Sequence, residues 1–349
     1  MIQVEESTRS TPVAPLRAAI DEGSRSADTL PVALACPRCR RAVKSVFQRF
    51  ECVACGEVAT MDRDVVDFVR TEDYASSFGR QWSTFRHVQL DSRNGTTISA
   101  DQFARVTGWG HAELDGATVL DGGCGAGRYS EVAARLGAKV VGLDLSSAAF
   151  VTRENVPNCA AVVRGSILEP PFAPGSFDKV FSIGVLQHTP DPLGAAQKLM
   201  ELVKPGGQLA IWMYERKVTT PFLPKMVLRR LTRGWSEEKI DRLVDRLVTA
   251  FTPVARAGAH LPGKRLKHLL WGALPIASYW YLLPLDPQSQ QQWSVLDTHD
   301  WLTPKYDDPQ TFEALSAALK AGGATRVERI DVPGLTVRAV AGHRRDEGL

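Results

Sequence analysis

Strong net charge, an N-terminal apolar stretch and internal repeats are all missing from this sequence. The 349 residues include 42 Lys and Arg against 39 Asp and Glu, a formal net charge of +3. That charge is too small to indicate nucleic-acid binding by bulk electrostatics. Acidic and polar residues follow Met1, with no apolar stretch behind them, so we expect no secretory signal and a cytoplasmic location.

A long uninterrupted apolar run is also missing, although one segment comes close. Residues 268–285 contain no Asp, Glu, Lys or Arg, and these 18 residues reach only the lower edge of the length that a membrane span needs. Pro275 and Pro284 interrupt the segment, and its Trp and Tyr side chains suit a half-wet surface. We predict a buried lid helix. The alternatives are a contact with an apolar, lipid-like acceptor or a membrane surface and, least favoured, a true span.

Disulfides are not expected, because four of the six cysteines sit in two tight pairs in a chain without an export signal. Cys36-x-x-Cys39 and Cys52-x-x-Cys55 are separated by twelve residues. Four thiolates from two such turns suit Zn²⁺ in a closed tetrahedral site, with iron as the next candidate. We therefore predict a zinc ribbon with a structural role. Recognition of a partner through the basic residues of the ribbon is the alternative.

From Ala117 onward, short apolar runs alternate with amphipathic stretches. ATVLDGG is typical of a strand, GRYSEVAARLG of a helix that ends at Gly137, and AKVVGLDLS of the next strand. Further strands are predicted at AAVVRGS, FDKVFSIG and GQLAIWMY, with a helix at LGAAQKLMELV. This alternation predicts an α/β fold, doubly wound, with a mostly parallel sheet and helices on both faces.

The alternation stops near residue 217 and returns near residue 301. The helical, aromatic stretch between them is therefore predicted to be a cap inserted over the ligand edge of the sheet. The predicted parts are a flexible tail (1–30), the zinc ribbon (31–70), a helical lead-in covering the cofactor (71–116), the cofactor-binding core (117–216), the helical cap insertion (217–300) and the C-terminal part of the core (301–349).

The glycine-rich turn after the first strand of this core carries the main functional signal. Asp121-x-Gly123-x-Gly125-x-Gly127 lies between a strand and a helix, and the missing side chains let the backbone approach a ligand. A dinucleotide fold prefers G-x-G-x-x-G, but Arg128 occupies the place of the third glycine. Asp121 would also repel a pyrophosphate. S-adenosylmethionine (SAM) has no phosphate and carries a sulfonium and an ammonium, so the turn predicts SAM binding.

A second acidic residue supports this interpretation. Asp144 comes 17 residues after Gly127, at the end of the strand in VVGLDLS. An acid at the end of the second strand is placed to accept hydrogen bonds from both ribose hydroxyls. We therefore predict that Asp144 and the adjacent Leu145 belong to the cofactor site.

These residues resemble the class I SAM-dependent methyltransferases, and the likeness covers about Ala117 to Arg216. PFAPGSFDKVFSIGVLQHTPDP is similar to the family's fourth-strand motif, and LVKPGGQLAIWMYE to its fifth-strand segment. The resemblance implies a Rossmann-like fold and methyl transfer. In that family an acidic residue after the third strand usually hydrogen-bonds the adenine amino group. This chain has Ser166 there, so the resemblance implies a contact from the Ser166 hydroxyl or the Ile167 backbone instead.

Candidate catalytic residues follow the later strands of the core. A hydroxyl acceptor needs a base with a pKa near neutrality, and His188 lies in the turn after FDKVFSIGVLQ, at the edge where ligands bind. Tyr214 ends the next predicted strand and shares that edge. His299, Asp300 and Tyr306 lie where the cap rejoins the core. For each of these residues, a purely structural role in a loop is the alternative.

Three functions remain open from the sequence. The first is a methyltransferase that acts on a small-molecule acceptor, by O- or N-methylation in a biosynthetic pathway. YASSFGRQW and WSVLDTHDWLTPKYDDP resemble a bacterial subgroup associated with specialised-metabolite and surface-glycan pathways. The second is an RNA methyltransferase, since bacterial rRNA guanine methyltransferases resemble this order of ribbon and core. The third is a non-catalytic protein that binds SAM and zinc. Near-neutral charge and an aromatic cap favour the first.

Overall fold

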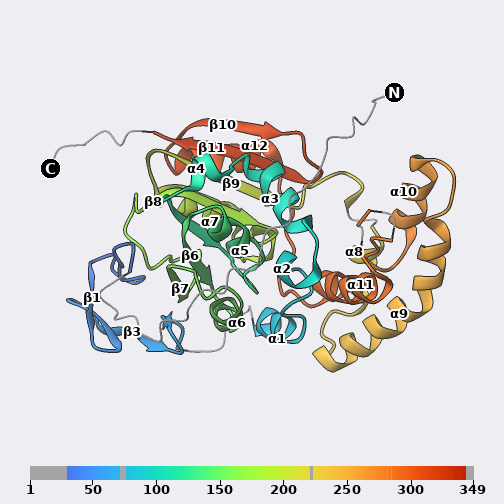
Figure 1. Cartoon of the computed structure of the whole chain (residues 1–349), viewed down its shortest axis with the longest axis horizontal. Helices are drawn as coiled ribbons and strands as arrows, with labels where there is room; N and C mark the ends of the chain where they lie inside the picture. The colour runs from blue at the N-terminus through green and yellow to red at the C-terminus, as the bar shows by residue number, and fades with distance from the viewer. Residues whose placement is uncertain (1–29, 71–75, 221–222, 281, 284, 343–349) are drawn as a thin grey trace.

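The computed structural model describes residues 30–70, 76–220, 223–280, 282–283 and 285–342 (Figure 1). Nearly all of the predicted tail, residues 1–29, therefore lies outside the described residues, as do Tyr281 and Pro284 of the apolar segment. Within the described part of the chain, the strands form one sheet in the order β1-β2-β3-β4-β7-β6-β5-β8-β9-β11-β10.

Short apolar runs form the parallel centre of this sheet. They are β5 (Thr118–Gly122), β6 (Lys139–Asp144), β7 (Ala161–Arg164), β8 (Phe177–Ile183) and β9 (Val203–Met213). Neighbours in the order β7-β6-β5-β8-β9 all pair in parallel, which confirms the predicted α/β core. Because the carboxyl ends of parallel strands meet at one edge, the turns after these strands gather there.

Antiparallel strands extend the sheet on both sides of this centre. One side adds the hairpin of β10 (Ala324–Ile330) and β11 (Leu335–Ala341), and β11 pairs with β9. The other side adds β1 (Val43–Val46), β2 (Arg49–Cys52), β3 (Gly56–Asp62) and β4 (Val65–Asp67). In this second group β4 pairs with β7 in parallel. The sheet is thus mixed around a parallel centre, and the strands that carry the cysteines are continuous with it.

Helices cover both faces of the parallel centre. One face is covered by α3 (Ile98–Thr107), α5 (Arg128–Arg135) and α6 (Ala148–Asn155), and the other by α7 (Pro192–Glu201) and α12 (Phe312–Ala321). Successive strand residues alternate between these faces. Val119 packs under the first group of helices, and its neighbour Leu120 packs under the second. This period of two, in strands buried on both sides, explains why each strand is an almost continuous apolar run.

The lead-in to the core is helical, as its sequence predicts. It consists of α1 (Ser76–Thr84), α2 (Asp91–Asn94), α3 and α4 (His111–Leu114). The buried Asp91 carboxylate accepts the backbone N–H groups of Ser99 and Ala100 in the first turn of α3, at 3.0 and 2.9 Å. This arrangement satisfies donors that a helix N-terminus leaves without partners.

A group of helices forms the cap. These are α8 (Pro224–Leu231), α9 (Glu237–Gly258), α10 (Lys264–Ala273) and α11 (Pro287–Leu302). They share an apolar core of their own, built around Ile240, Val244 and Val248 of α9. In Figure 1 the cap lies at the right of the molecule, and the strands that carry the cysteines lie at the left, with the parallel centre between them. The parallel centre, to which the glycine-rich turn after β5 belongs, therefore lies between the cap and the strands that carry the cysteines.

The prediction of a lid helix over the apolar segment 268–285 is wrong, because this segment does not form one continuous helix. Helix α10 ends at Ala273, two residues before Pro275, and Leu274, Ile276 and Ala277 then pack into the protein. Among the described residues, no helix combines the length and apolarity needed to cross a membrane.

Candidate active site

The glycine turn connects β5 to α5 at the carboxyl edge of the sheet. Gly123, Gly125 and Gly127 all have positive φ, at 92°, 53° and 88°. A Cβ atom on Gly123 would lie 2.4 Å from the Val185 side chain, and one on Gly125 would lie 3.2 Å from the Trp82 ring. Both conformation and space therefore require glycine at Gly123.

Asp144 stands directly beside this turn. Its carboxylate accepts hydrogen bonds from the Gly125 N–H at 2.9 Å and from the Ser146 N–H and hydroxyl at 2.8 and 2.7 Å. Burial nevertheless raises the pKa of Asp144. The carboxylate thus has hydrogen-bond donors on both oxygens, and it faces a cavity beside the glycine turn. Further lone pairs remain for hydroxyl donors from a ligand.

One cavity of about 640 Å³ joins the glycine turn to the cap. This volume is within the range of small-molecule sites. Its walls come from the glycine turn, the ends of β6, β8 and β9, the lead-in helix α1, and the cap. The residues that line it include Gln81, Trp82, Asp144, His188, Tyr214, Tyr279, Trp293, Asp297 and Asp300. Polar and charged side chains converge on it from several elements, and aromatic rings form much of the remaining wall.

The predicted cofactor residues divide into two groups by position. Those that line the cavity are Gly123, Gly125, Asp144, Leu145 and Ile167.

Asp121, Gly127 and Ser166 are not among the residues that line it. Asp121 is buried under the turn, accepts the Ser130 hydroxyl at 2.6 Å, and has its pKa raised to about 7 by burial. The Ser166 hydroxyl accepts the Leu168 N–H at 3.1 Å and so stabilises its own turn. Of the two adenine contacts that the resemblance offers, only Ile167 faces the cavity.

His188 ends the short helix η2 (Leu186–His188) and lines the cavity. Its Nδ1–H donates to the Tyr306 carbonyl at 3.1 Å, which leaves Nε2 facing the Asp300 carboxylate 3.6 Å away. Burial alone would lower the pKa of His188, but the Asp300 charge more than offsets it, so the pKa is raised. The same pair holds the pKa of Asp300 below its usual value despite burial.

The predicted tyrosines have different positions. Tyr214 lines the cavity, its ring packs edge-on against His188 with centroids 5.8 Å apart, and its hydroxyl donates to Asp300 at 3.4 Å. Burial raises the pKa of Tyr214 well above its usual value. Tyr306 supplies the backbone carbonyl that orients His188, and it is not among the cavity residues. His299 pairs with Asp241 of α9 at 2.8 Å and is likewise not among them.

Sequence reasoning missed several residues of this cavity. Gln81 and Trp82 come from α1, and Trp293 and Asp297 come from α11. Their two segments resemble a known subgroup, but local sequence does not show that they share a cavity, because they meet only when the lead-in and the cap fold over the same sheet edge. Arg128, noted only for interrupting the glycine pattern, also lines the cavity and donates to Ser99, Gln89 and Gln102.

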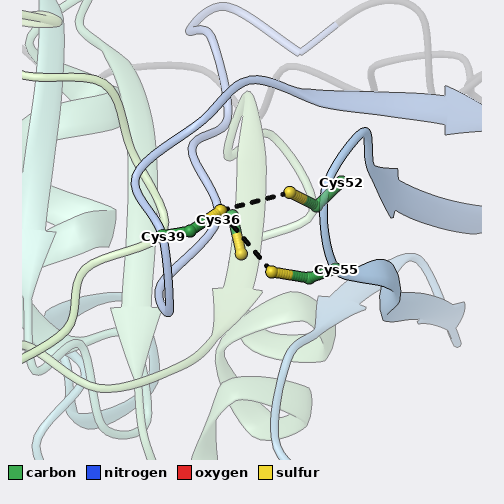
Figure 2. Close-up of side chains that lie close together, drawn as sticks. All are labelled: Cys36, Cys39, Cys52 and Cys55. Carbon is green, nitrogen blue, oxygen red and sulfur yellow. Dashed lines mark hydrogen bonds between the residues drawn. The ribbon is translucent and has the colours of Figure 1, made fainter.

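The four paired cysteines converge on one point (Figure 2). All four Sγ atoms lie within 4.8 Å of one another, and the Cys39 sulfur is 3.4 Å from Cys52 and 3.5 Å from Cys55. Tetrahedral zinc with Zn–S bonds of about 2.3 Å needs sulfur atoms about 3.8 Å apart, so the donor set fits such an ion. The Ala54 N–H also points at the Cys52 sulfur, at 3.4 Å. Amide donors of this kind support a metal-bound thiolate.

Comparison with known proteins finds similarity in the part of the chain that contains the glycine turn and Asp144. The family model described as "Methyltransferase domain" matches residues 120–211. A ubiquinone biosynthesis O-methyltransferase from Cupriavidus pinatubonensis is 36% identical over 138 residues, which are 36% of this chain and 55% of that protein. Another from Xanthomonas campestris pv. campestris is 44% identical over 101 residues, covering 28% and 42%.

The chain spans about half the length of the curated relatives it matches. A solved S-adenosylmethionine dependent methyltransferase from Mesorhizobium loti is 20% identical over 65% of this chain and 92% of its own, with a TM-score of 0.37. That score is too low to support a conclusion. The matched residues 120–211 contain the glycine turn, Asp144 and His188, whereas the cysteine cluster and the cap lie outside them. The chain therefore contains a methyltransferase domain of the class I, SAM-dependent type.

Proposed function

We propose that this protein transfers a methyl group from SAM to a small-molecule acceptor. The observation that carries the proposal is the single cavity that runs from the glycine turn and Asp144 to His188, Tyr214 and the cap. A cofactor held at one end and an acceptor at the other would meet within it. Holding two reactants in the correct geometry supplies much of the acceleration of a displacement reaction. The relatives are named as O-methyltransferases, which supports a hydroxyl acceptor.

The residues at the sheet edge fit SAM. Asp144 would accept the ribose hydroxyls, and the chain of the cofactor would lie along Gly123 and Gly125, which line the same cavity. Ile167 would give an apolar wall to the adenine. Bound SAM would supply an electrophilic methyl group on a sulfonium centre. The aromatic rings of Trp82 and Phe78, which line the same cavity, help exclude water from it.

His188 is the residue we assign to the acceptor proton. Its Nδ1–H is committed to the Tyr306 carbonyl, so Nε2 is the atom that can take up a proton. Asp300, 3.6 Å from Nε2, stabilises the resulting imidazolium. An imidazole that a backbone carbonyl orients, with a carboxylate nearby to stabilise its charged form, is an arrangement suited to general-base catalysis. Tyr214 contacts both members of this pair and is the second candidate.

The cysteine cluster is assigned to one structural zinc ion. Four thiolates without an open coordination position are typical of a closed site that stabilises the fold. Each of Cys36, Cys39, Cys52 and Cys55 would supply one sulfur.

Transfer of label from radioactive SAM tests the proposed function. The purified protein is incubated with labelled SAM and either a metabolite extract or total RNA. We expect label in the small-molecule fraction and none in RNA. Label in RNA alone would overturn the small-molecule acceptor. A protein that neither binds SAM nor transfers label to either sample would contradict the methyltransferase activity itself.

A further inference from the structure

A polar cluster at the cap end of the cavity is left unused by this function. Asp297 of α11 is its centre, and its carboxylate faces the cavity. The Tyr279 hydroxyl donates to Oδ2 at 2.5 Å and the Trp293 indole N–H at 3.2 Å, while the Gln89 amide donates to Oδ1 at 3.3 Å. All three donors are neutral. Among the described residues, no Lys, Arg or His pairs directly with Asp297.

The neighbouring carboxylate differs in this respect. Asp300, one helical turn along α11, has His188 as its charged partner. Arg128 forms no ion pair with Asp297. It donates to the Gln89 amide at 3.2 Å, which in turn donates to Asp297 at 3.3 Å, and its charge offsets only part of the effect of burial on the pKa of Asp297. A half-buried carboxylate that only neutral groups contact is poorly compensated, because removing its hydration costs more than neutral donors return.

A second acceptor points to the same place. Gln81 of α1 is buried, and its amide N–H donates to the Leu296 carbonyl, next to Asp297, at 3.2 Å. That bond fixes the orientation of the amide. Its Oε1 atom is buried without a donor in the described part of the chain, and Gln81 lines the cavity. Leaving a buried acceptor without a donor is energetically costly, so a donor supplied by a ligand would be favourable.

The rings around these acceptors suit a cation. Trp293 and Tyr279 both donate to Asp297 and line the cavity, and Trp82 lies beside Gln81 in α1. Aromatic faces attract ammonium groups, most strongly where water is excluded. The Arg128 guanidinium, whose Cζ lies 5.3 Å from the Trp293 ring centroid, shows that this ring already interacts with a cation. An ammonium has three donors and no acceptor, which matches the acceptors Asp297 and Gln81 Oε1.

We propose that the methyl acceptor carries a protonated amine, which Asp297 and Gln81 Oε1 bind at the cap end of the cavity. This inference rests on the proposed function and narrows its substrate class to amine-bearing small molecules. The amine is the group by which the acceptor is held, whichever of its atoms is methylated. A neutral or acidic acceptor would leave both Asp297 and Gln81 without the partner that their positions require.

The test compares two small molecules that differ only in carrying an amine or a hydroxyl group. Calorimetry measures binding of 2-phenylethylamine and 2-phenylethanol to the full-length protein saturated with SAM. We expect the amine to bind at least about tenfold tighter, as is typical for hydrogen bonds to charged groups. Asp297→Asn should remove this preference. Asp245→Asn, a matched loss of charge on the exposed surface of cap helix α9, should retain it.

A measurement without mutation guards against misfolding of the variant. Burial raises the pKa of Asp297 to about 6, so its charge is present above that pH and lost below it. The preference for the amine should therefore be present at pH 7.5 and decline by pH 5, where 2-phenylethylamine is still protonated. Equal binding of the two probes, no binding of the amine, or a preference that persists in Asp297→Asn overturns the inference. Normal SAM affinity in the same samples would leave the proposed function intact.

Discussion

At the scale of single residues, His188 and Asp300 form a charge-coupled pair within the site. His188 binds its proton more tightly in the folded protein than in the unfolded chain, because Asp300 outweighs the cost of burial. The pair therefore contributes stability that is fully present below about pH 6.5. That contribution is lost as the pH rises through the higher folded-state pKa. The neutral form of His188, which a general base needs, becomes populated as the pH rises through the same folded-state pKa.

The first prediction follows from this pair. If His188 is the base, kcat/KM should rise with pH through a value above about 6.5, the ordinary histidine pKa. His188→Ala should lower kcat by about a hundred- to ten-thousandfold while SAM still binds. Asp300→Asn removes the opposing charge but keeps the burial, so the rising limb should move to lower pH. A pH profile that is the same in wild type and Asp300→Asn would contradict the assignment.

The second prediction concerns Asp144. Hydrogen bonds to an ionised acceptor contribute about 1.5–3 kcal/mol each. Asp144→Ala should therefore weaken SAM binding by at least about tenfold in calorimetry. Asp245→Ala, which removes an exposed carboxylate of the cap, serves as the control. Because Asp144 also accepts the Gly125 N–H, thermal unfolding of the variant is recorded in parallel. Equal SAM affinity in a folded variant would exclude the proposed position of the ribose.

At the scale of elements, the cap exposes apolar side chains beside basic ones. Leu269 is 73% exposed and Leu266 is 45% exposed on α10, where exposed Arg265 lies beside them, and Leu231 at the end of α8 is 67% exposed. Apolar groups flanked by positive charge are typical of contact with an anionic membrane surface. Of the alternatives that the sequence leaves open for residues 268–285, we therefore propose that Leu269 and its neighbours contact a membrane surface.

Vesicle co-sedimentation gives the third prediction. The protein should bind vesicles that contain phosphatidylglycerol more strongly than vesicles of phosphatidylcholine alone. Leu269→Asp should reduce this binding, because burying a Leu side chain contributes about 1.5–3 kcal/mol. Phe47→Asp, which alters an apolar residue 95% exposed in the turn between β1 and β2, is the control. If both variants bind like the wild type, or the wild type does not bind, this contact is excluded.

Elements with strong local patterns were predictable, and contacts between distant segments were not. The runs around Leu120 and Val141 are apolar because they are buried on both faces, and this pattern identifies β5 and β6 directly. Gly123 and Asp144 were also identifiable, since backbone shape and charge constrain them locally. By contrast, the pairing of Val66 in β4 with Val163 in β7 joins segments about a hundred residues apart. No local periodicity records such a pairing.

At the scale of the whole molecule, that strand pairing connects the cysteine cluster to the cofactor site. The Asp67 carboxylate in β4 accepts from Arg164 at 3.1 Å, and Arg164 in turn donates to the Leu145 carbonyl at 3.3 Å. Leu145 lines the cavity next to Asp144. Arg40, within the cysteine loops, also donates to the Phe172 carbonyl at 2.9 Å. A change in the fold of the cysteine unit would therefore reach the residues that we assign to SAM.

The fourth prediction tests this connection. The protein should contain about one zinc per chain, and Cys52→Ser or a chelator should remove it and lower the thermal midpoint, since metal binding is coupled to folding in such sites. SAM affinity should then fall by about fivefold or more, a typical coupling between linked sites. Added zinc, but not magnesium, should restore both properties to the chelated wild type.

Asp67→Ala keeps all four thiols and should weaken SAM binding without loss of zinc. Unchanged SAM affinity in zinc-free protein would show that the cysteine unit and the cofactor site are independent, whereas a zinc content near zero in untreated protein would contradict the metal assignment itself.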